Sequence, residues 1–198
     1  MPDNSVIFDF ETLSTDRVNC PVLNMAMLSF DSERFLSGPY TYKSLIEKSK
    51  FIKFNVEDQV KNWGRKIDHD TLKWWGTQGP DAQRQMIPSQ YDQGIDKLFD
   101  FWQENKPAQL CKIYTRGNNF DPIIMDYIFE QTGYNKDEAY KFYQFRDTRS
   151  TIDALAWGHN LNNSFIPDGL EEHFVVHDPK HDIAMDVMRL QTLVKAIS

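Results

Sequence analysis

Short apolar runs alternate along this chain with segments whose apolar residues recur at helical spacing. Five of the runs have the length of a strand, and the first ends in charged residues, as a buried strand does where its carboxyl end meets a polar site. A turn is predicted at Asp31 and Ser32, between the second and third runs. We therefore expect strands at Ser5–Phe10, Val22–Phe30, Arg34–Leu36, Gln109–Tyr114 and Tyr140–Phe145.

Four longer segments are predicted to be helices. One has Pro122 in its first turn, where the missing N–H costs nothing, and stops at Gly133. Another repeats apolar residues at the spacing of an amphipathic helix. The four segments are Asp92–Glu104, Asp121–Thr132, Arg149–Gly158 and Asp182–Ile197.

The order of these elements, strands first and then strands alternating with helices, predicts an α/β or mixed-sheet domain. Residues 45–79 carry several short helical patterns, and we expect residues 43–88 to form a helical insert packed beside the sheet. The chain has 198 residues, 40% of them apolar, which is enough for one cored domain over residues 1–198 but not for two.

The charge pattern excludes a globally basic nucleic-acid coat protein. With 22 basic and 29 acidic residues the net charge is −7. Residues 43–73 nevertheless hold eight basic and five acidic side chains, an excess that suits either a local backbone-binding groove or a solvated charged face.

The two cysteines, Cys20 and Cys111, lie far apart and outside any CxxC spacing, which argues against a disulfide framework and a thiolate zinc site. No run approaches the roughly 18 apolar residues of a membrane span, and the N-terminus lacks the positive region of a signal peptide. We therefore expect no membrane partner and a cytoplasmic location.

Two acids at the end of the first predicted strand are the most informative pair. Residues two apart in a strand point to the same face, so Asp9 and Glu11 lie side by side, while Phe8 and Phe10 take the other face. Two adjacent carboxylates repel each other unless one is protonated or a cation lies between them. The pair therefore suits a divalent-metal site, although a solvated strand end capped by acids is the simpler interpretation.

Two later segments offer further ligands, each with a structural alternative. Asp121 follows a predicted strand and opens a helix, a position where α/β sites gather ligands but also where an aspartate caps the helix. His177 and Asp182 are five residues apart at the start of the last helix, close enough for a histidine to face a site to which Asp182 contributes. Either His177 or His181 alone is more often a surface or capping residue.

Taken together in this order, the DxE, the mid-chain Phe-Asp and the late HxxxxD resemble the DEDDh class of 3′–5′ exonucleases. The chain is most similar to the T-even phage exonuclease A group, which is related to a mycobacterial-type exoribonuclease family. The resemblance rests on five segments in matching order: Asp9–Thr12, Thr71–Trp75, Arg116–Asp121, Arg146–Asp147 and His177–Asp182. It implies a ribonuclease H-like exonuclease fold, a five-stranded mixed sheet flanked by helices.

The resemblance also implies a site for two divalent ions, Mg²⁺ or Mn²⁺, held by hard oxygen donors. Asp9 would bridge both ions, Glu11 and Asp182 would bind the ion that activates water, and Asp121 would help to hold the other. His177 would be the general base because it stands at the class spacing, with His181 as the competing candidate.

Contacts to the substrate are expected mainly from aromatic and basic residues. Base stacking by Trp74 or Trp75 competes with core packing, and the sequence leaves open which ring does which. The wider class often places an asparagine where this chain has Gly117, and Asn118 or Asn119 is a substitute. Asp147 is expected to cap the helix that follows it. The predicted contacts are Phe10, Thr12, Leu13, Trp74, Trp75, Arg116 and Asn119, with Arg146 as a further phosphate candidate.

The implied activity is metal-dependent 3′–5′ hydrolysis of nucleic acid to nucleoside 5′-monophosphates, with a single-stranded 3′ end as the partner. We expect DNA as the substrate, with RNA as the alternative. An idle nucleic-acid-binding module and a purely structural domain are the other classes. A phage-encoded chain would act in the host cytoplasm, and the sequence predicts no oligomeric state.

Overall fold

One mixed sheet runs through the centre of the computed structural model, which describes residues 3–198. Its strand order is β3-β2-β1-β4-β5, with β2 antiparallel to both β1 and β3, and β1, β4 and β5 parallel to one another. The predicted five-stranded mixed sheet is therefore confirmed. The strands are β1 (Ser5–Thr12), β2 (Val22–Phe30), β3 (Lys50–Lys53), β4 (Lys112–Thr115) and β5 (Phe145–Asp147).

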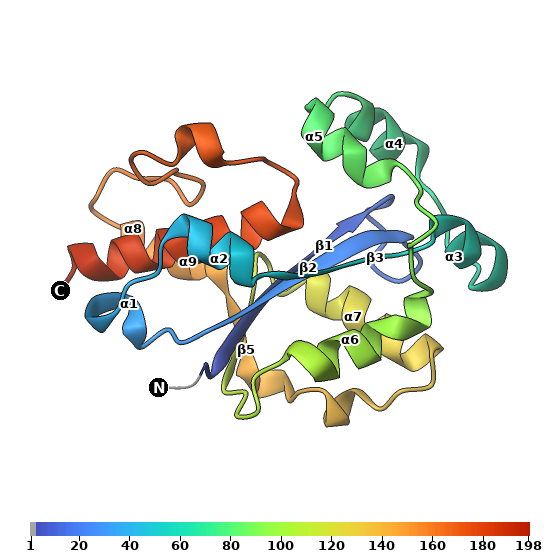
Figure 1. Cartoon of the computed structure of the whole chain (residues 1–198), viewed down its shortest axis with the longest axis horizontal. Helices are drawn as coiled ribbons and strands as arrows, with labels where there is room; N and C mark the ends of the chain where they lie inside the picture. Colours follow the sequence, from blue (N-terminus) through green and yellow to red (C-terminus); the bar gives the residue numbers. More distant parts are fainter. Residues whose placement is uncertain (1–2) are drawn as a thin grey trace.

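Helices cover both faces of this sheet (Figure 1), as predicted. Short 3₁₀ turns join several of them, at Arg84–Met86, Ile95–Lys97, Lys136–Glu138, Phe142–Gln144 and Glu171–His173. The α-helices are α1 (Arg34–Ser37), α2 (Tyr42–Lys48), α3 (Val56–Asn62), α4 (His69–Gly76), α5 (Pro80–Gln83), α6 (Leu98–Asn105), α7 (Asp121–Gln131), α8 (Thr148–Ala156) and α9 (Pro179–Ala196).

The alternation of side chains along β1 divides the core into two halves. Phe8 and Phe10 pack under α6 and α7 with Trp102 and Phe129, whereas Ile7 packs under α8 and α9 on the other face. Residues 5, 7, 9 and 11 share that second face. The strand therefore carries its two acids to the same side as the amino end of α9.

Two predicted strands need correction, and one strand was missed. Arg34–Leu36 is not a strand but lies in the one-turn helix α1, whose Phe35 is buried in the second half of the core. The fifth strand is instead β3, inside the segment expected to be helical, where two lysines flank an apolar pair and hide the pattern. In Tyr140–Phe145 only the last residue is in a strand, because a 3₁₀ turn precedes β5.

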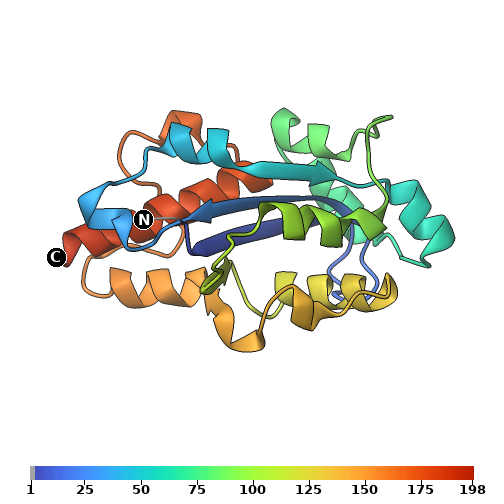
Figure 2. The ribbon, with the colours of Figure 1, turned by 60° about the horizontal axis from the view of Figure 1, so that its bottom comes forward.

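The segment of residues 43–88 thus contributes an edge strand as well as helices. Its helices α3, α4 and α5 gather at the end of the sheet opposite the C-terminus (Figure 2). Buried side chains fix it to the main domain. The Gln59 amide exchanges two hydrogen bonds of 2.8 Å with the backbone of Val22, and Arg65 donates to the Cys20 carbonyl at 2.7 Å.

Helix α4 is fixed to the end of β1 through one of its two adjacent indoles. Trp75 is fully buried beside Leu13 and Leu23, and its Nε1–H donates to the carbonyl of Thr12 at 2.9 Å. Trp74, rotated about 100° around the helix, is 42% exposed. The sequence had left open which indole is in the core, and the structure assigns this role to Trp75.

No helix among the described residues is long and apolar enough to cross a membrane.

The two indoles should differ sharply in their effect on stability. We expect Trp75→Ala to lower the free energy of unfolding by about 3–5 kcal/mol, because it leaves a large cavity. Trp74→Ala should cost less than about 1.5 kcal/mol, the value of an aromatic contact. Urea unfolding of both variants measures the difference, and equal large losses would contradict it.

Candidate active site

The end of β1 places two carboxylates next to each other. Asp9 and Glu11 lie opposite Ala26 and Asn24 of β2, and the pairing shifts by one residue directly after Glu11. Both line one cavity of about 1070 Å³ at the carboxyl ends of the parallel strands. This is where ligands bind in open α/β sheets.

Asp121 joins these acids from the first residue of α7. It is only 3% exposed, and its Oδ1 accepts a hydrogen bond from the backbone N–H of Phe10 at 3.1 Å. Phe120 holds the N-cap position, and no side chain caps this helix. The capping interpretation of Asp121 is therefore wrong, and its carboxylate turns to β1 instead.

Asp182 and His177 come from the amino end of α9. The backbone N–H of His177 donates to Asp182 Oδ2 at 3.1 Å. Asp178, which lies between the two in sequence, caps α9. His177 has φ +63°, a left-handed conformation that a non-glycine residue keeps only when its surroundings hold it. Potential ligand atoms of Glu11, His177 and Asp182 lie within 4.8 Å of one another.

The two histidines of this segment face different surroundings. The ring of His177 meets that of Trp74 edge-on, with centroids 4.7 Å apart, and lines the large cavity. His181 Nδ1 is 2.8 Å from the hydroxyl of Tyr42 on α2 and accepts the N–H of Val175. His177 is therefore the histidine that faces the acids.

Burial and mutual repulsion disturb the titration of the acids. Burial first, and then the neighbouring carboxylates, raise the pKa of Asp9 and Glu11 well above the usual range. Burial raises the pKa of Asp121 and of Asp182 from 3.8 to about 7. Burial lowers the pKa of His177, so its imidazole is neutral at pH 7.

This donor set fits divalent cations. Four carboxylates converge, yet within residues 3–198 none of them forms an ion pair with a basic side chain. Anions clustered in a partly buried site stay ionised together only with positive charge from outside the protein, and otherwise some of them bind protons. Oxygen donors of this kind are those that Mg²⁺ and Mn²⁺ prefer.

The predicted substrate contacts fall into three groups. Phe10, Arg116 and Asn119 line the large cavity, and Thr12 and Trp74 line an adjoining cavity of about 430 Å³ that also includes Phe10. By contrast, Leu13 and Trp75 are buried in the core and line neither cavity, so their predicted contact with substrate is not supported.

Other predicted polar residues are engaged within the protein. Asp147 accepts the N–H of Ser150 and caps α8, as predicted. Asn118 Oδ1 accepts the hydroxyl of Thr115, and Arg146 donates to the backbone carbonyls of Tyr143 and Phe145.

The basic excess of residues 43–73 does not reach either cavity. Arg65 is buried against Cys20, and several lysines form ion pairs with nearby acids, for example Lys48 with Asp3 and Lys73 with Asp70. None of the eight basic residues lines a cavity. Of the two interpretations given to this segment, the solvated charged face fits better than a groove at the site.

Sequence analysis missed three charged residues that line the large cavity, namely Arg149, Asp186 and Arg189. One signal was available, because Asp186 and Arg189 follow Asp182 by four and seven residues and so share its helix face. Arg149 is the second residue of α8, two residues after the cap Asp147, and no spacing in the sequence relates it to α9.

Comparisons with known proteins agree with this geometry. The sequence model of the 3′–5′ exoribonuclease Rv2179c-like domain matches residues 4–187. The exodeoxyribonuclease of Enterobacteria phage T4 is 29% identical over 201 residues, which cover 93% of this chain and 86% of the phage protein.

Among solved structures, one of exonuclease I has a TM-score of 0.62 at 17% identity. E. coli exonuclease I in complex with a dA16 oligonucleotide gives 0.61 at 15% identity. Both alignments cover 97% of this chain, which spans about 40% of the length of those proteins. The likeness confirms the predicted ribonuclease H-like fold.

The raised pKa values predict an unusual pH dependence for the metal-free protein. Between pH 4 and 7 the folded state holds protons on Asp121 and Asp182 that the unfolded state has released, so these groups lower stability as pH rises. In EDTA we expect Tm to fall from pH 5 to pH 8, by about 2–4 °C for each 1 kcal/mol lost. Added Mn²⁺ should raise Tm more at pH 8 than at pH 5.

Asp9→Asn provides the matched variant for this measurement. It removes one charge at constant shape, so its Tm in EDTA should fall less with pH and should gain less from Mn²⁺. A wild-type Tm that neither falls with pH in EDTA nor responds to Mn²⁺ would contradict the cation site.

Proposed function

The chain belongs to the 3′–5′ exoribonuclease Rv2179c-like domain family and is a 3′–5′ exonuclease of the DEDDh type, and on that premise we propose that it releases nucleoside 5′-monophosphates from the 3′ end of single-stranded DNA. The observation that carries the proposal is the convergence of Asp9, Glu11, Asp121 and Asp182 beside a neutral His177 in one large cavity.

The four carboxylates would hold two divalent ions, Mg²⁺ or Mn²⁺. When bound, such ions would neutralise the acids and stabilise the negative charge that develops on the phosphate and on the leaving 3′-oxygen. The protein itself fixes the four side chains. Asp121 is held by the N–H of Phe10 and Asp182 by the N–H of His177, so the ligands are oriented before substrate arrives.

His177 would be the general base that takes a proton from the attacking water at a ring nitrogen. Its lowered pKa favours the neutral form, which can accept that proton. The edge-on contact of the ring with Trp74 and the hydrogen bond from the backbone N–H of His177 to Asp182 restrict where the imidazole can lie.

The smaller cavity would take the 3′-terminal nucleoside. Trp74, half exposed on its wall, offers a face on which a base can stack, an interaction worth about 1–3 kcal/mol. Phe10 and Glu11 line both cavities, so the terminal sugar would lie next to the acids.

DNA is our proposed substrate because the T4 relative, similar over most of both chains, is an exodeoxyribonuclease. The description of the family favours RNA as the second candidate. The test uses single-stranded DNA and RNA of the same sequence, labelled at the 5′ or the 3′ end, with Mg²⁺, Mn²⁺ or EDTA.

With Mg²⁺ or Mn²⁺, 5′-labelled DNA should shorten one nucleotide at a time, and 3′-labelled DNA should release a labelled mononucleotide at once. EDTA and Asp9→Asn should abolish both. Release of a labelled 5′ mononucleotide before the strand has shortened would overturn the polarity. Faster loss of RNA would overturn the choice of DNA, and no hydrolysis of either would favour an idle binding module.

The two histidines separate in a second test. We expect His177→Ala to lower kcat by about 10²–10⁴, the usual effect of losing a general base, with affinity for Mn²⁺ retained. His181→Ala, which breaks the contact with Tyr42 away from the cavity, should keep kcat within about threefold of wild type. The opposite pattern would transfer the base to His181.

A further inference from the structure

The large cavity is divided by charge. Four of its six acids come from the ends of β1, α7 and α9. Arg116, Arg149 and Arg189 line it, together with Asp147 and Asp186, from the ends of β4 and β5, the start of α8 and further along α9. Arg189 follows Asp182 by seven residues, which places it about 10 Å along the helix. One end of the cavity therefore holds four acids without a basic partner. The other, which we call the basic end, holds three arginines and two aspartates and so has a net positive charge.

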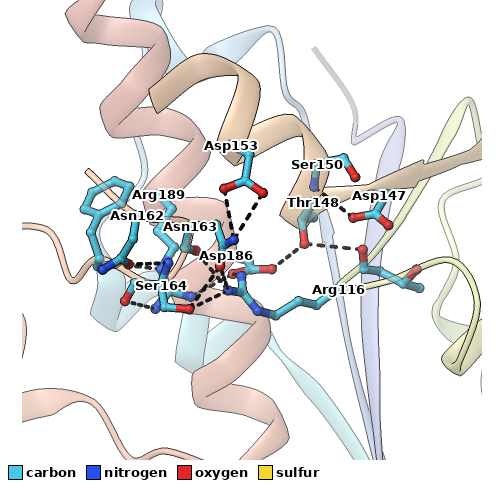
Figure 3. A network of polar contacts seen from close by, with 12 residues as sticks. Arg116, Asp147, Thr148, Ser150, Asp153, Asn162, Asn163, Ser164, Asp186 and Arg189 are labelled. Atoms are coloured by element: carbon cyan, nitrogen blue, oxygen red, sulfur yellow. Dashed lines mark hydrogen bonds and ion pairs between the residues drawn. The ribbon is translucent and has the colours of Figure 1, made fainter. Parts of the chain in front are cut away.

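A buried ionic cluster builds the basic end (Figure 3). Both oxygens of Asp186 are used, because Oδ1 accepts Arg116 Nη1 at 2.6 Å and Arg189 Nη1 at 2.8 Å, and Oδ2 accepts the hydroxyl of Thr148. The side chains of Asp186 and Arg189 are only 2% and 5% exposed. Two guanidinium groups share one carboxylate, so the cluster keeps one excess positive charge.

This excess charge is held rigidly and faces the cavity. Arg116 Nη2 donates to the carbonyl and side chain of Asn163 and to the hydroxyl of Ser164, and the amide of Asn163 donates in turn to Asp153 (Figure 3). The side chain of Arg116 remains 22% exposed.

Arg149 adds a second cation that the protein does not use. It lines the same cavity and is exposed, and over residues 3–198 its guanidinium has neither an ion pair nor a hydrogen bond. Arg146, three residues earlier, instead donates to the backbone carbonyls of Tyr143 and Phe145 and lines neither cavity.

The smaller cavity has the opposite character. Asp68 and Asp70 line it together with Thr71 and Trp74, and no lysine or arginine is among its lining residues. Such a cavity suits a terminal nucleoside with a free 3′-hydroxyl and disfavours a continuing phosphate backbone. The rest of the nucleic-acid strand, on the 5′ side of the terminal nucleoside, would then lie along the basic end of the large cavity.

We propose that Arg149, which lines the same cavity as the Asp186-held Arg116, binds one of the first two phosphates on the 5′ side of the scissile phosphate. The proposal rests on the proposed exonuclease function and deepens it, because this charge division would set the direction in which the strand lies. A guanidinium suits this task since it donates several hydrogen bonds to phosphate oxygens.

The test removes the charge from either partner. Oligodeoxynucleotides carry one neutral methylphosphonate, at the first or the second linkage 5′ of the scissile one. For wild type with Mg²⁺ we expect kcat/KM to fall about tenfold at one of the two positions. Arg149→Gln should lose a similar factor on unmodified DNA and lose little more on the methylphosphonate, because both changes remove the same contact.

Arg146→Gln is the matched control and should keep the full sensitivity of wild type to the methylphosphonate. If Arg149→Gln stays as sensitive as wild type, or if wild type is indifferent at both positions, the proposal is overturned. Fluorescence anisotropy of the same oligonucleotides in Ca²⁺ repeats the comparison without turnover. Charge-dependent binding through Arg149 without any hydrolysis would overturn the proposed function and leave the phosphate contact intact.

Discussion

Repulsion among four buried and half-buried carboxylates that line one cavity governs the arrangement of the elements around them. Asp9, Glu11, Asp121 and Asp182 have no basic partner in the described chain, and their raised pKa values express the free-energy cost of keeping them charged. A fold that served only stability would not retain such a cluster. Protonation or bound cations would relieve this repulsion, so the same arrangement that lowers the stability of the ionised, metal-free protein would create an affinity for metal.

The sheet and the helices packed on it hold the four acids in place. β1 is the central strand, paired on both sides and packed on both faces, so the acids at its end cannot move apart. The starts of α7 and α9 bring the other two acids, each fixed by one backbone N–H. Trp75 ties α4 to the end of β1, and this contact leaves Trp74 beside His177. Core packing thereby positions the candidate base and a stacking surface together.

The distribution of charge around the acids gives the cavity a direction. A protein with a net charge of −7 cannot attract a polyanion through its overall field, so attraction has to be local. The buried Asp186 makes this possible. It stabilises two arginines that would otherwise repel each other, and still leaves one positive charge facing the cavity. An acidic smaller cavity lies on the other side of Glu11.

Local signals along the chain were enough to predict several features. Alternation through Asp9 and Glu11 predicted two acids on one face, and Pro122 and Gly133 marked the bounds of α7. The last helix was predicted from Asp182, three residues after the start of α9 at Pro179. Features that depend on distant contacts became clear only in the folded structure. Arg34–Leu36 is helical and Lys50–Lys53 is a strand, since the secondary structure of a short segment depends on the surface it packs against. In the structure Trp75 lies in the core and Trp74 lines the smaller cavity. His181 contacts the hydroxyl of Tyr42 and not the acids. The tertiary structure also brings Arg149 and Arg116 to the same cavity, a juxtaposition of separate elements that no spacing along the chain encodes.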